Sequence, residues 1–251
     1  MTDRPWYEQF FGEDYLRMYL PNLPDVQTEE QVEAMLALLG LPPGASLLDL
    51  CCGHGRHAVR FAARGLRVTG QDLSELFLER ARAEADRRSV EVRWVHGDMR
   101  EIPFESEFDA VINYFTAFGY LEDEEEDLKV LRQVAKALKP GGRFLLETMH
   151  RDNLLRRFLP SSVTRHEDGL MVIEERKIDV LTSRINSRAT LLEPDGSRTE
   201  RRNSLRLYTL RELTRMLSAA GLEVEKACGG LDGSPATLDS TRLVLISRRP
   251  E

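Results

Sequence analysis

The feature that most constrains this chain is a stretch in which an apolar run leads through a glycine-containing turn into a helical pattern. The stretch, Leu47–Ala58, reads LLDLCCGHGRHA in one-letter code. Such a strand–turn–helix suits a nucleotide-like ligand. Its glycines let the backbone approach the ligand closely, and the helix that follows offers free N–H groups and the positive end of its dipole. The stretch therefore predicts a binding site for a nucleotide-like molecule, whose identity depends on the rest of the chain.

Strand and helix patterns alternate around this stretch. Strands are predicted at 46–50, 66–70, 90–95, 108–113 and 142–148, and helices at 28–39, 56–63, 74–87 and 124–138. Thr28 is expected to cap the first helix and Ser74 the third. Strands separated by helices of this length imply βαβ units and a parallel sheet.

The pattern changes after His150. Residues 170–208 alternate apolar and polar positions and contain the turn signal Pro194-Asp195-Gly196, which predicts an antiparallel meander. A helix at 210–220 and two closing strands at 222–227 and 242–247 follow. We therefore expect four segments: an aromatic N-terminal arm (1–28), an α/β core (29–150), an antiparallel β insert (151–207) and the C-terminal part of the core (208–251).

The N-terminal arm can pack against the domain and can also form a lid over the ligand pocket, and we expect such a lid. Its aromatic side chains are Trp6, Tyr7, Phe10, Phe11, Tyr15 and Tyr19.

Composition excludes several classes of protein. A formal net charge of −7 argues against a protein whose main task is to grip nucleic-acid phosphates. No apolar run approaches the roughly 20 residues that span a bilayer, and the N-terminus lacks the pattern of a secretory signal. Of the three cysteines, Cys51 and Cys52 are adjacent, so neither a disulfide framework nor a zinc site is expected. A cytoplasmic protein without metal and without membrane contact is predicted.

Two cofactors compete for the opening motif. Gly53, Gly55 and Ala58 satisfy the dinucleotide fingerprint, and Asp72 lies about twenty residues further on, where ribose-binding acids fall. That pattern alone would allow an NAD-dependent dehydrogenase.

Three further features favour S-adenosylmethionine. Asp49 precedes the loop, where a carboxylate suits the ammonium of an amino-acid end and would repel a pyrophosphate. Asp98 follows the third strand, where it can accept a hydrogen bond from the adenine amine, with Met99 beside the ring. The last two strands suggest an antiparallel hairpin, whereas a dinucleotide domain would more often continue with parallel units.

At these residues the chain resembles the class I S-adenosylmethionine-dependent methyltransferase family, over about 45–150 and again over 208–248. The resemblance rests on five blocks, which occur in order: Leu48–Gly55, Val68–Ser74, Gly97–Met99, Phe108–Asn113 and Leu138–Arg143. It implies an α/β fold with a Rossmann-like seven-stranded sheet, its last strand antiparallel, flanked by helices. The antiparallel insert then forms a β cap. Many family members have glycine at the position of Cys51, so the turn there must accommodate a side chain.

The resemblance also implies roles for single residues. Gly53 and Gly55 border the methionine part of the cofactor, Asp72 holds the ribose hydroxyls, and Asn113 lies beside the methyl group. The predicted cofactor-binding set is Asp49, Cys51, Gly53, Gly55, Asp72, Leu73, Asp98, Met99 and Asn113.

Methyl transfer from a sulfonium is an in-line displacement that needs mainly orientation and exclusion of water, so a catalytic triad is not required. His150, just past the fifth strand, and Tyr208, where the chain leaves the insert, are candidate catalytic residues on the substrate side. Arg56, at a helix start, is expected to pair with an acid or a carboxylate.

We predict methylation of a nitrogen or oxygen of a small molecule by a monomer or homodimer, with the β insert covering the substrate. An RNA methyltransferase of the same fold, an NAD-dependent dehydrogenase and a non-catalytic cofactor-binding module remain as alternatives.

Overall fold

The computed structural model describes residues 5–251, so the first four residues of the expected N-terminal arm lie outside the described part. Within this range seven strands form one sheet, in the order β10-β11-β5-β4-β1-β2-β3. These strands are β1 (Ser46–Leu50), β2 (Arg67–Asp72), β3 (Arg93–His96), β4 (Phe108–Asn113), β5 (Leu138–Met149), β10 (Glu223–Cys228) and β11 (Arg242–Arg248).

The last strand, β11, runs antiparallel to both of its neighbours, β5 and β10, whereas β1 to β5 pair in parallel. This is the predicted Rossmann-like sheet with its antiparallel last strand. All five residues of β1 are buried, because helices cover both of its faces. Because β1, β2 and β4 are parallel, the polar residues that follow them meet at the carboxyl ends of these strands.

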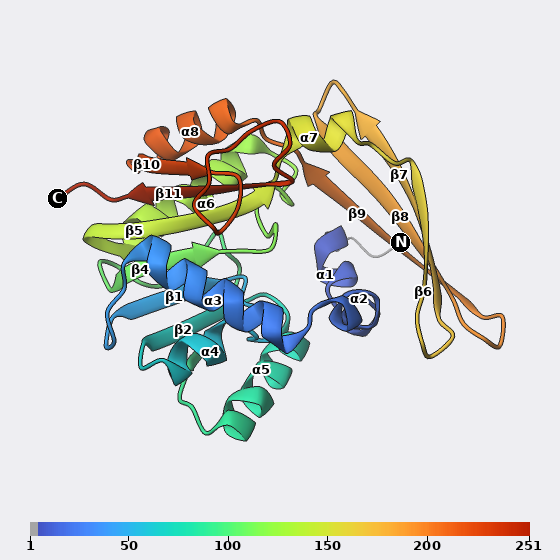
Figure 1. Cartoon of the computed structure of the whole chain (residues 1–251), viewed down its shortest axis with the longest axis horizontal. Coiled ribbons are helices and arrows are strands. Elements are labelled where there is room, and N and C mark those ends of the chain that lie inside the picture. The colour runs from blue at the N-terminus through green and yellow to red at the C-terminus, as the bar shows by residue number, and fades with distance from the viewer. Residues whose placement is uncertain (1–4) are drawn as a thin grey trace.

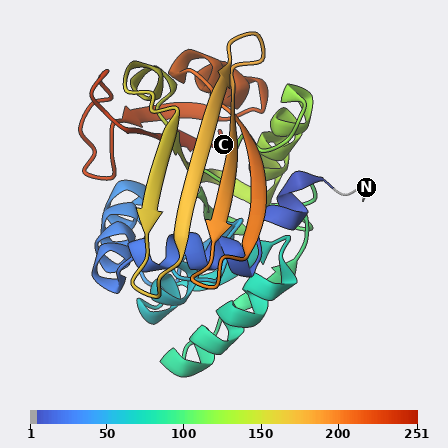
Figure 2. The ribbon, with the colours of Figure 1, turned by 90° about the vertical axis from the view of Figure 1, so that its right-hand side faces the viewer.

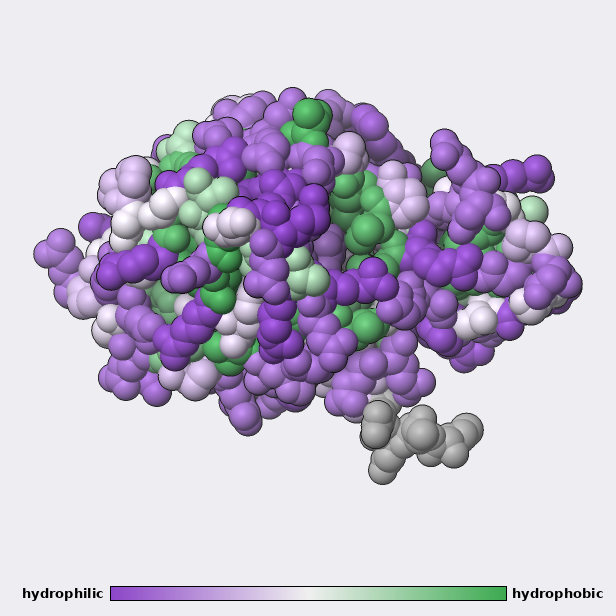
Figure 3. Space-filling view, turned by 90° about the horizontal axis from the view of Figure 1, so that it is seen from below, coloured by the Kyte–Doolittle hydropathy of each residue, from purple (hydrophilic) through white to green (hydrophobic). Residues whose placement is uncertain are grey.

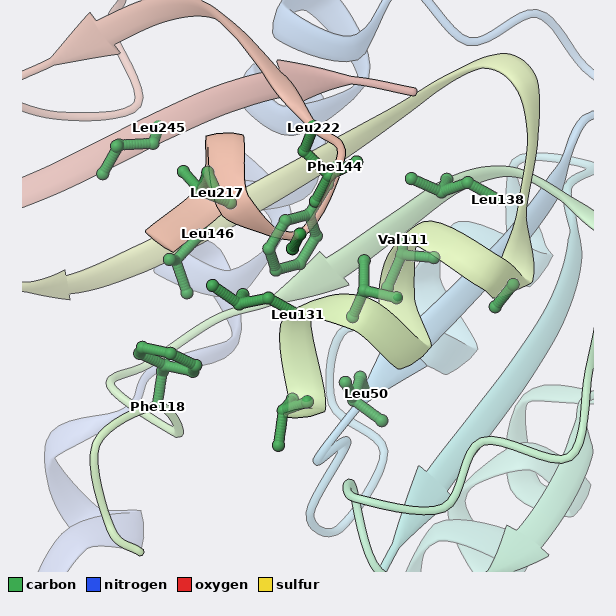
Figure 4. Close-up of a cluster of buried hydrophobic side chains, with 14 of the residues drawn as sticks. Leu50, Val111, Phe118, Leu131, Leu138, Phe144, Leu146, Leu217, Leu222 and Leu245 are labelled. Atoms are coloured by element: carbon green, nitrogen blue, oxygen red, sulfur yellow. The ribbon is translucent and has the colours of Figure 1, made fainter. Parts of the chain in front are cut away.

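Helices pack on both faces of this sheet (Figure 1). On one face lie α3 (Asp25–Leu39) and α4 (Ala58–Ala63), and on the other α6 (Glu124–Ala137) and α8 (Leu210–Ala219). A fifth helix, α5 (Glu75–Arg88), packs against α4, against the edge strand β3 and against its neighbour β2. In Figure 4, Leu131 of α6 and Leu217 of α8 lie over Phe144 and Leu146 of the sheet. Burial of these apolar side chains is the main force that holds the layers together.

A second sheet lies beside the core and forms a cap (Figures 1 and 2). Its strands are β6 (Ser161–Arg165), β7 (Met171–Asp179), β8 (Arg184–Leu192) and β9 (Arg198–Arg206), all antiparallel to their neighbours. The predicted turn at Pro194-Asp195-Gly196 joins β8 to β9, with a hydrogen bond from the N–H of Gly196 to the carbonyl of Glu193.

The N-terminal helices lie between the core and the cap (Figure 1). These are α1 (Trp6–Phe10), α2 (Glu13–Tyr19) and a 3-10 turn (Leu20–Asn22). Phe10 and Met18 pack against Val172 and Leu191 of the cap sheet in one apolar cluster. Seen from below, apolar side chains gather between the core and the cap, and the surrounding surface is mostly hydrophilic (Figure 3).

Several element boundaries differ from the sequence-based expectation. The first long helix begins at Asp25 rather than at Thr28, because Pro24 is extended and occupies the N-cap position. Strand β3 begins at Arg93 rather than at 90. The insert contains two elements that its pattern did not predict, β6 and the short helix α7 (Arg151–Arg156). Strand β6 is a largely exposed edge strand, and it therefore lacks the apolar alternation that marks a half-buried strand.

Residues 5–251 contain neither a membrane-spanning helix nor a cluster of metal-ligating side chains. No helix there is long and apolar enough to cross a membrane. In the same residues, no three His, Cys, Asp or Glu side chains are grouped as a metal site requires.

Candidate active site

The loop after β1 has the backbone that its sequence predicts. Cys51, Gly53 and Gly55 all have positive φ angles, of 61°, 57° and 77°. At Gly55 a β-carbon would lie 2.8 Å from side-chain carbons of both Ala81 and Trp94, so only glycine fits there. Cys51 adopts the left-handed conformation although it carries a side chain. The turn thus accommodates this side chain, as expected from the sequence.

A cavity opens at this loop, and we call it the cofactor cavity. It holds about 1110 Å³ of space free of protein atoms, part of it open to solvent. It lies at the carboxyl ends of β1, β2 and β4, which is where open α/β sheets bind their ligands. Seven of the nine predicted cofactor-binding residues line it: Asp49, Cys51, Gly53, Asp72, Leu73, Asp98 and Met99.

Asp49 and Arg56 bring unsatisfied charged groups into this cavity. Asp49 is 2% exposed, and one of its carboxylate oxygens, Oδ2, has no hydrogen-bond partner among the described residues. Burial raises the pKa of Asp49 to about 7, an effect that the nearby Arg56 opposes. Arg56 is 8% exposed; its Nη1 donates to Thr28 Oγ1 and Gln31 Oε1, but its Nη2 is buried and has no partner in the described chain. A carboxylate and a guanidinium left open in this way fit the ammonium and the carboxylate of a methionine moiety.

Asp72 and Asp98 lie further along the cavity. The two carboxylate oxygens of Asp72 accept from the backbone N–H groups of Gly53 and Ser74, each at 2.8 Å, and thereby tie the end of β2 to the glycine loop. Burial raises the pKa of Asp72, and these N–H groups oppose the rise. Burial alone would raise the pKa of Asp98 as well. Hydrogen bonds from Arg100 Nε (3.0 Å) and Nη2 (2.7 Å) outweigh this effect and hold the pKa of Asp98 below its usual value.

The other two predicted cofactor-binding residues lie behind the cavity wall. Gly55 packs against α5 and β3, where a side chain would not fit. Asn113 is buried at the end of β4, and its Nδ2 donates to the carbonyl of Leu50 at 3.1 Å. Both residues therefore contact the surroundings of the loop and do not line the cavity, and their predicted part in cofactor binding stays a prediction.

The two candidate catalytic residues line neither the cofactor cavity nor the second cavity described below. His150 Nδ1 lies 2.9 Å from the carbonyl oxygen of Ser240, so His150 fastens the start of α7 to the loop before β11. Tyr208 is 2% exposed, and its hydroxyl donates to Asp127 Oδ2 at 2.7 Å within the core. Each residue therefore has a structural contact that accounts for its burial.

A second cavity, which we call the cap cavity, lies between the core and the cap sheet. Its cap-side polar residues come from β6 to β9: Ser162, Glu174, Arg176, Ser187 and Asn203. From the core it receives Phe115, Thr116 and Arg242. Glu174 Oε2 accepts from Arg176 Nη2 at 2.6 Å, and its carboxylate also receives a hydrogen bond from Tyr19 of α2.

Four aromatic residues line both cavities: Tyr15, Tyr19, Phe115 and Tyr120. Tyr15 and Tyr19 come from the N-terminal arm, and their ring centroids lie 4.7 Å apart. The arm thus packs against the cap, and its aromatic side chains also line the cofactor cavity; that it acts as a lid stays a prediction. Burial raises the pKa of Tyr15 to about 12, so its hydroxyl stays protonated at neutral pH.

Sequence reasoning missed Glu147 and Glu174 as residues near the site. Glu147 stands alone as an acid in the apolar run of β5, and a charged side chain inside a buried strand is a signal that could have identified it. Glu174 belongs to an ordinary alternating strand, β7, and nothing in the sequence of this strand distinguishes Glu174 from its exposed acidic neighbour Glu175.

Comparisons with known proteins agree with this geometry. The profile of a family described as a methyltransferase domain matches residues 47–142. The chain is 34% identical, over 199 residues and 77% of each chain, to the dTDP-4-amino-2,3,4,6-tetradeoxy-D-glucose N,N-dimethyltransferase of Saccharopolyspora spinosa. Its fold matches all of the CcbJ methyltransferase of Streptomyces caelestis, over the whole of this chain, with a TM-score of 0.83 at 23% identity.

A third similar protein is CalS10, an amino pentose methyltransferase of Micromonospora echinaspora solved with S-adenosylmethionine bound. It aligns with a TM-score of 0.71 and 25% identity over 95% of this chain and 97% of its own. The chain therefore belongs to the class I S-adenosylmethionine-dependent methyltransferases, and S-adenosylmethionine is its cofactor.

Proposed function

We propose that this methyltransferase transfers a methyl group to an amino nitrogen of a small molecule held in the cap cavity. Family membership removes the dehydrogenase and the non-catalytic module as alternatives. Both CalS10 and the relative from Saccharopolyspora spinosa are named for methylation of amino sugars. An amino sugar, free or attached to a nucleotide, is thus the first acceptor to test.

The observation that carries the proposal is the shared aromatic boundary between the two cavities. A donor in the cofactor cavity and an acceptor in the cap cavity would meet at Tyr15, Tyr19, Phe115 and Tyr120. Aromatic faces attract cations, and both a sulfonium and a methylated ammonium are cations. Glu174 adds a carboxylate to the acceptor side, where it can accept a hydrogen bond from a neutral amine, whose lone pair takes the methyl group, and from the ammonium that the transfer forms.

The chain's own residues would act mainly by position and by exclusion of water. Asp49 and Arg56 would hold the two charged groups of the methionine end, Asp72 the ribose hydroxyls, and Asp98 with Met99 the adenine. S-adenosylmethionine, when bound, supplies an electrophilic methyl group. The aromatic side chains at the boundary would keep water from the reacting atoms, and Glu174 would orient the acceptor amine.

The test is transfer of labelled methyl from S-adenosylmethionine to a panel of amino sugars and their nucleotides, with matched hydroxyl compounds and total RNA, and identification of products by mass. We expect amine methylation, and we expect Glu174→Gln to raise the KM of the amine at least tenfold. Glu175→Gln is the matched control, because Glu175 is exposed and pairs with Arg188 instead. Exclusive methylation of hydroxyl compounds, or salt-sensitive methylation of RNA, would replace the proposal.

We further propose a cytoplasmic enzyme that acts as a monomer or a homodimer. The free thiols of Cys51, Cys52 and Cys228 support a reducing compartment. Light scattering on the purified chain would decide between the two assembly states.

A further inference from the structure

The wall between the two cavities has an unusual backbone. Phe115 and Thr116, just after β4, are consecutive non-glycine residues with φ angles of 69° and 56°. The left-handed conformation costs such residues about 1–3 kcal/mol each, so the surroundings must hold them in place. Phe115 lines both cavities, and Thr116 lines the cap cavity.

A buried acid on the neighbouring strand holds these two residues. Glu147 of β5 is 2% exposed, and its Oε2 accepts from the backbone N–H of Thr116 at 2.8 Å. Its carboxylate also receives the N–H of Phe115. On the next strand, Arg242 Nε lies 3.2 Å from Glu147 Oε1, and Arg242 Nη1 donates to Thr116 Oγ1 at 2.6 Å. Glu147 and Arg242 together hold the backbone and the threonine side chain of the wall.

Positive charge flanks the wall on both sides. The Arg56 guanidinium, in the cofactor cavity, lies 5.1 Å from the centre of the Phe115 ring, and the Arg242 guanidinium, in the cap cavity, lies 5.8 Å from it. Burial raises the pKa of Glu147, whereas Arg242, the two N–H groups and Arg56 favour its charged form. Glu147 is therefore the anion that offsets the charge of Arg242 at this wall.

We propose that Glu147 is a positioning residue that fixes Phe115 and Thr116 as the wall between donor and acceptor. Its negative charge also lets a positively charged methyl donor bind beside Arg56 and Arg242. The inference rests on the proposed placement of S-adenosylmethionine in the cofactor cavity. It has a charge-specific consequence, because the cofactor carries a sulfonium and its product, S-adenosylhomocysteine, carries a neutral thioether. At a partly buried site a nearby charge discriminates between these two ligands.

The experiment measures the affinities of S-adenosylmethionine and S-adenosylhomocysteine by calorimetry, without an acceptor, for the parent chain and three variants. Glu147→Gln should weaken S-adenosylmethionine at least fivefold more than S-adenosylhomocysteine. Arg242→Gln should shift the ratio of the two affinities in the opposite direction, because Glu147 then lacks its main counter-charge. The double variant should bring this ratio back to within twofold of the parent.

A control variant and a melting curve separate charge from loss of fold. Glu225→Gln removes an acid that pairs with Arg143 at 2.9 Å on the same sheet but lines neither cavity, and it should leave the ratio unchanged. If Glu147→Gln does not fold, Arg242→Gln alone still tests the sign of the effect. Equal weakening of both ligands in Glu147→Gln, or no change in Arg242→Gln, would overturn the inference. Failure of the parent chain to bind either ligand would instead refute the proposed cofactor site.

Discussion

Replacement of Arg56 by methionine tests how the cofactor cavity selects its ligand. Arg56 Nη2 is buried without a partner, whereas its Nη1 is satisfied by Thr28 and Gln31. If Nη2 binds the methionine carboxylate, the variant loses one hydrogen bond between charged groups. Such a bond contributes about 1.5–3 kcal/mol, which corresponds to roughly a 10- to 100-fold loss of affinity.

The assay compares two ligands that share adenosine and the thioether. S-adenosylhomocysteine carries the amino-acid end, and 5′-methylthioadenosine lacks it. Calorimetry on Arg56→Met should show the 10- to 100-fold loss for the first ligand and less than a threefold change for the second. The ratio of the two affinities is independent of the fraction of protein that is folded, so it separates binding from stability.

Arg60→Met provides the matched control for this change. Arg60 is a 2% exposed arginine of α4, four residues after Arg56 in the turn that precedes this helix; it is held by Glu29 and Asp25, and it does not line the cofactor cavity. The control should keep the parent's preference for S-adenosylhomocysteine even where it lowers the melting temperature. Equal weakening of both ligands by Arg56→Met would refute the reasoning, and it would mean that Arg56 serves only to hold α3 against the glycine loop.

Three further predictions follow from buried carboxylates. Asp72→Ala should weaken S-adenosylhomocysteine at least tenfold by calorimetry, and unchanged affinity would show that the ribose assignment is wrong. Tyr208→Phe should lower the free energy of unfolding in urea by about 1–3 kcal/mol, because Asp127 Oδ2 loses its partner; an unchanged urea midpoint would contradict this. Burial raises the pKa of Asp49 to about 7, so between about pH 4 and pH 7 the folded chain keeps a proton that the unfolded chain releases. The contribution of Asp49 to the free energy of unfolding therefore falls as the pH rises through this range. Without cofactor, the gain in melting temperature of Asp49→Asn over the parent should therefore grow between about pH 5 and pH 8, and a gain independent of pH would count against the shift.

The parts of the site that sequence predicted well are those built from neighbours in the chain. The strand, turn and helix around Asp49, Gly53 and Arg56 occupy a dozen residues, so their chemistry is visible as a pattern. Ser74 caps α5 as expected, and its hydroxyl accepts from the N–H of Phe77. His150 could not be judged in this way, because its partner is the carbonyl of Ser240, which lies 90 residues further along the chain.

The proposed acceptor half of the site is harder to predict, because its residues are likewise far apart in the sequence. Its cap cavity is assembled from the N-terminal arm, the ends of β4, β5 and β11, and all four cap strands. The charge available to a ligand there depends on pairing, because Arg176, two residues from Glu174, donates to one oxygen of its carboxylate and offsets part of its charge. A count of charged residues in the insert therefore says little about the acceptor. In the proposed site, the shared aromatic boundary and the pair of buried Glu147 and half-buried Arg242 would limit the acceptor more directly, because they would determine where it can approach the methyl group and which charge it can bring.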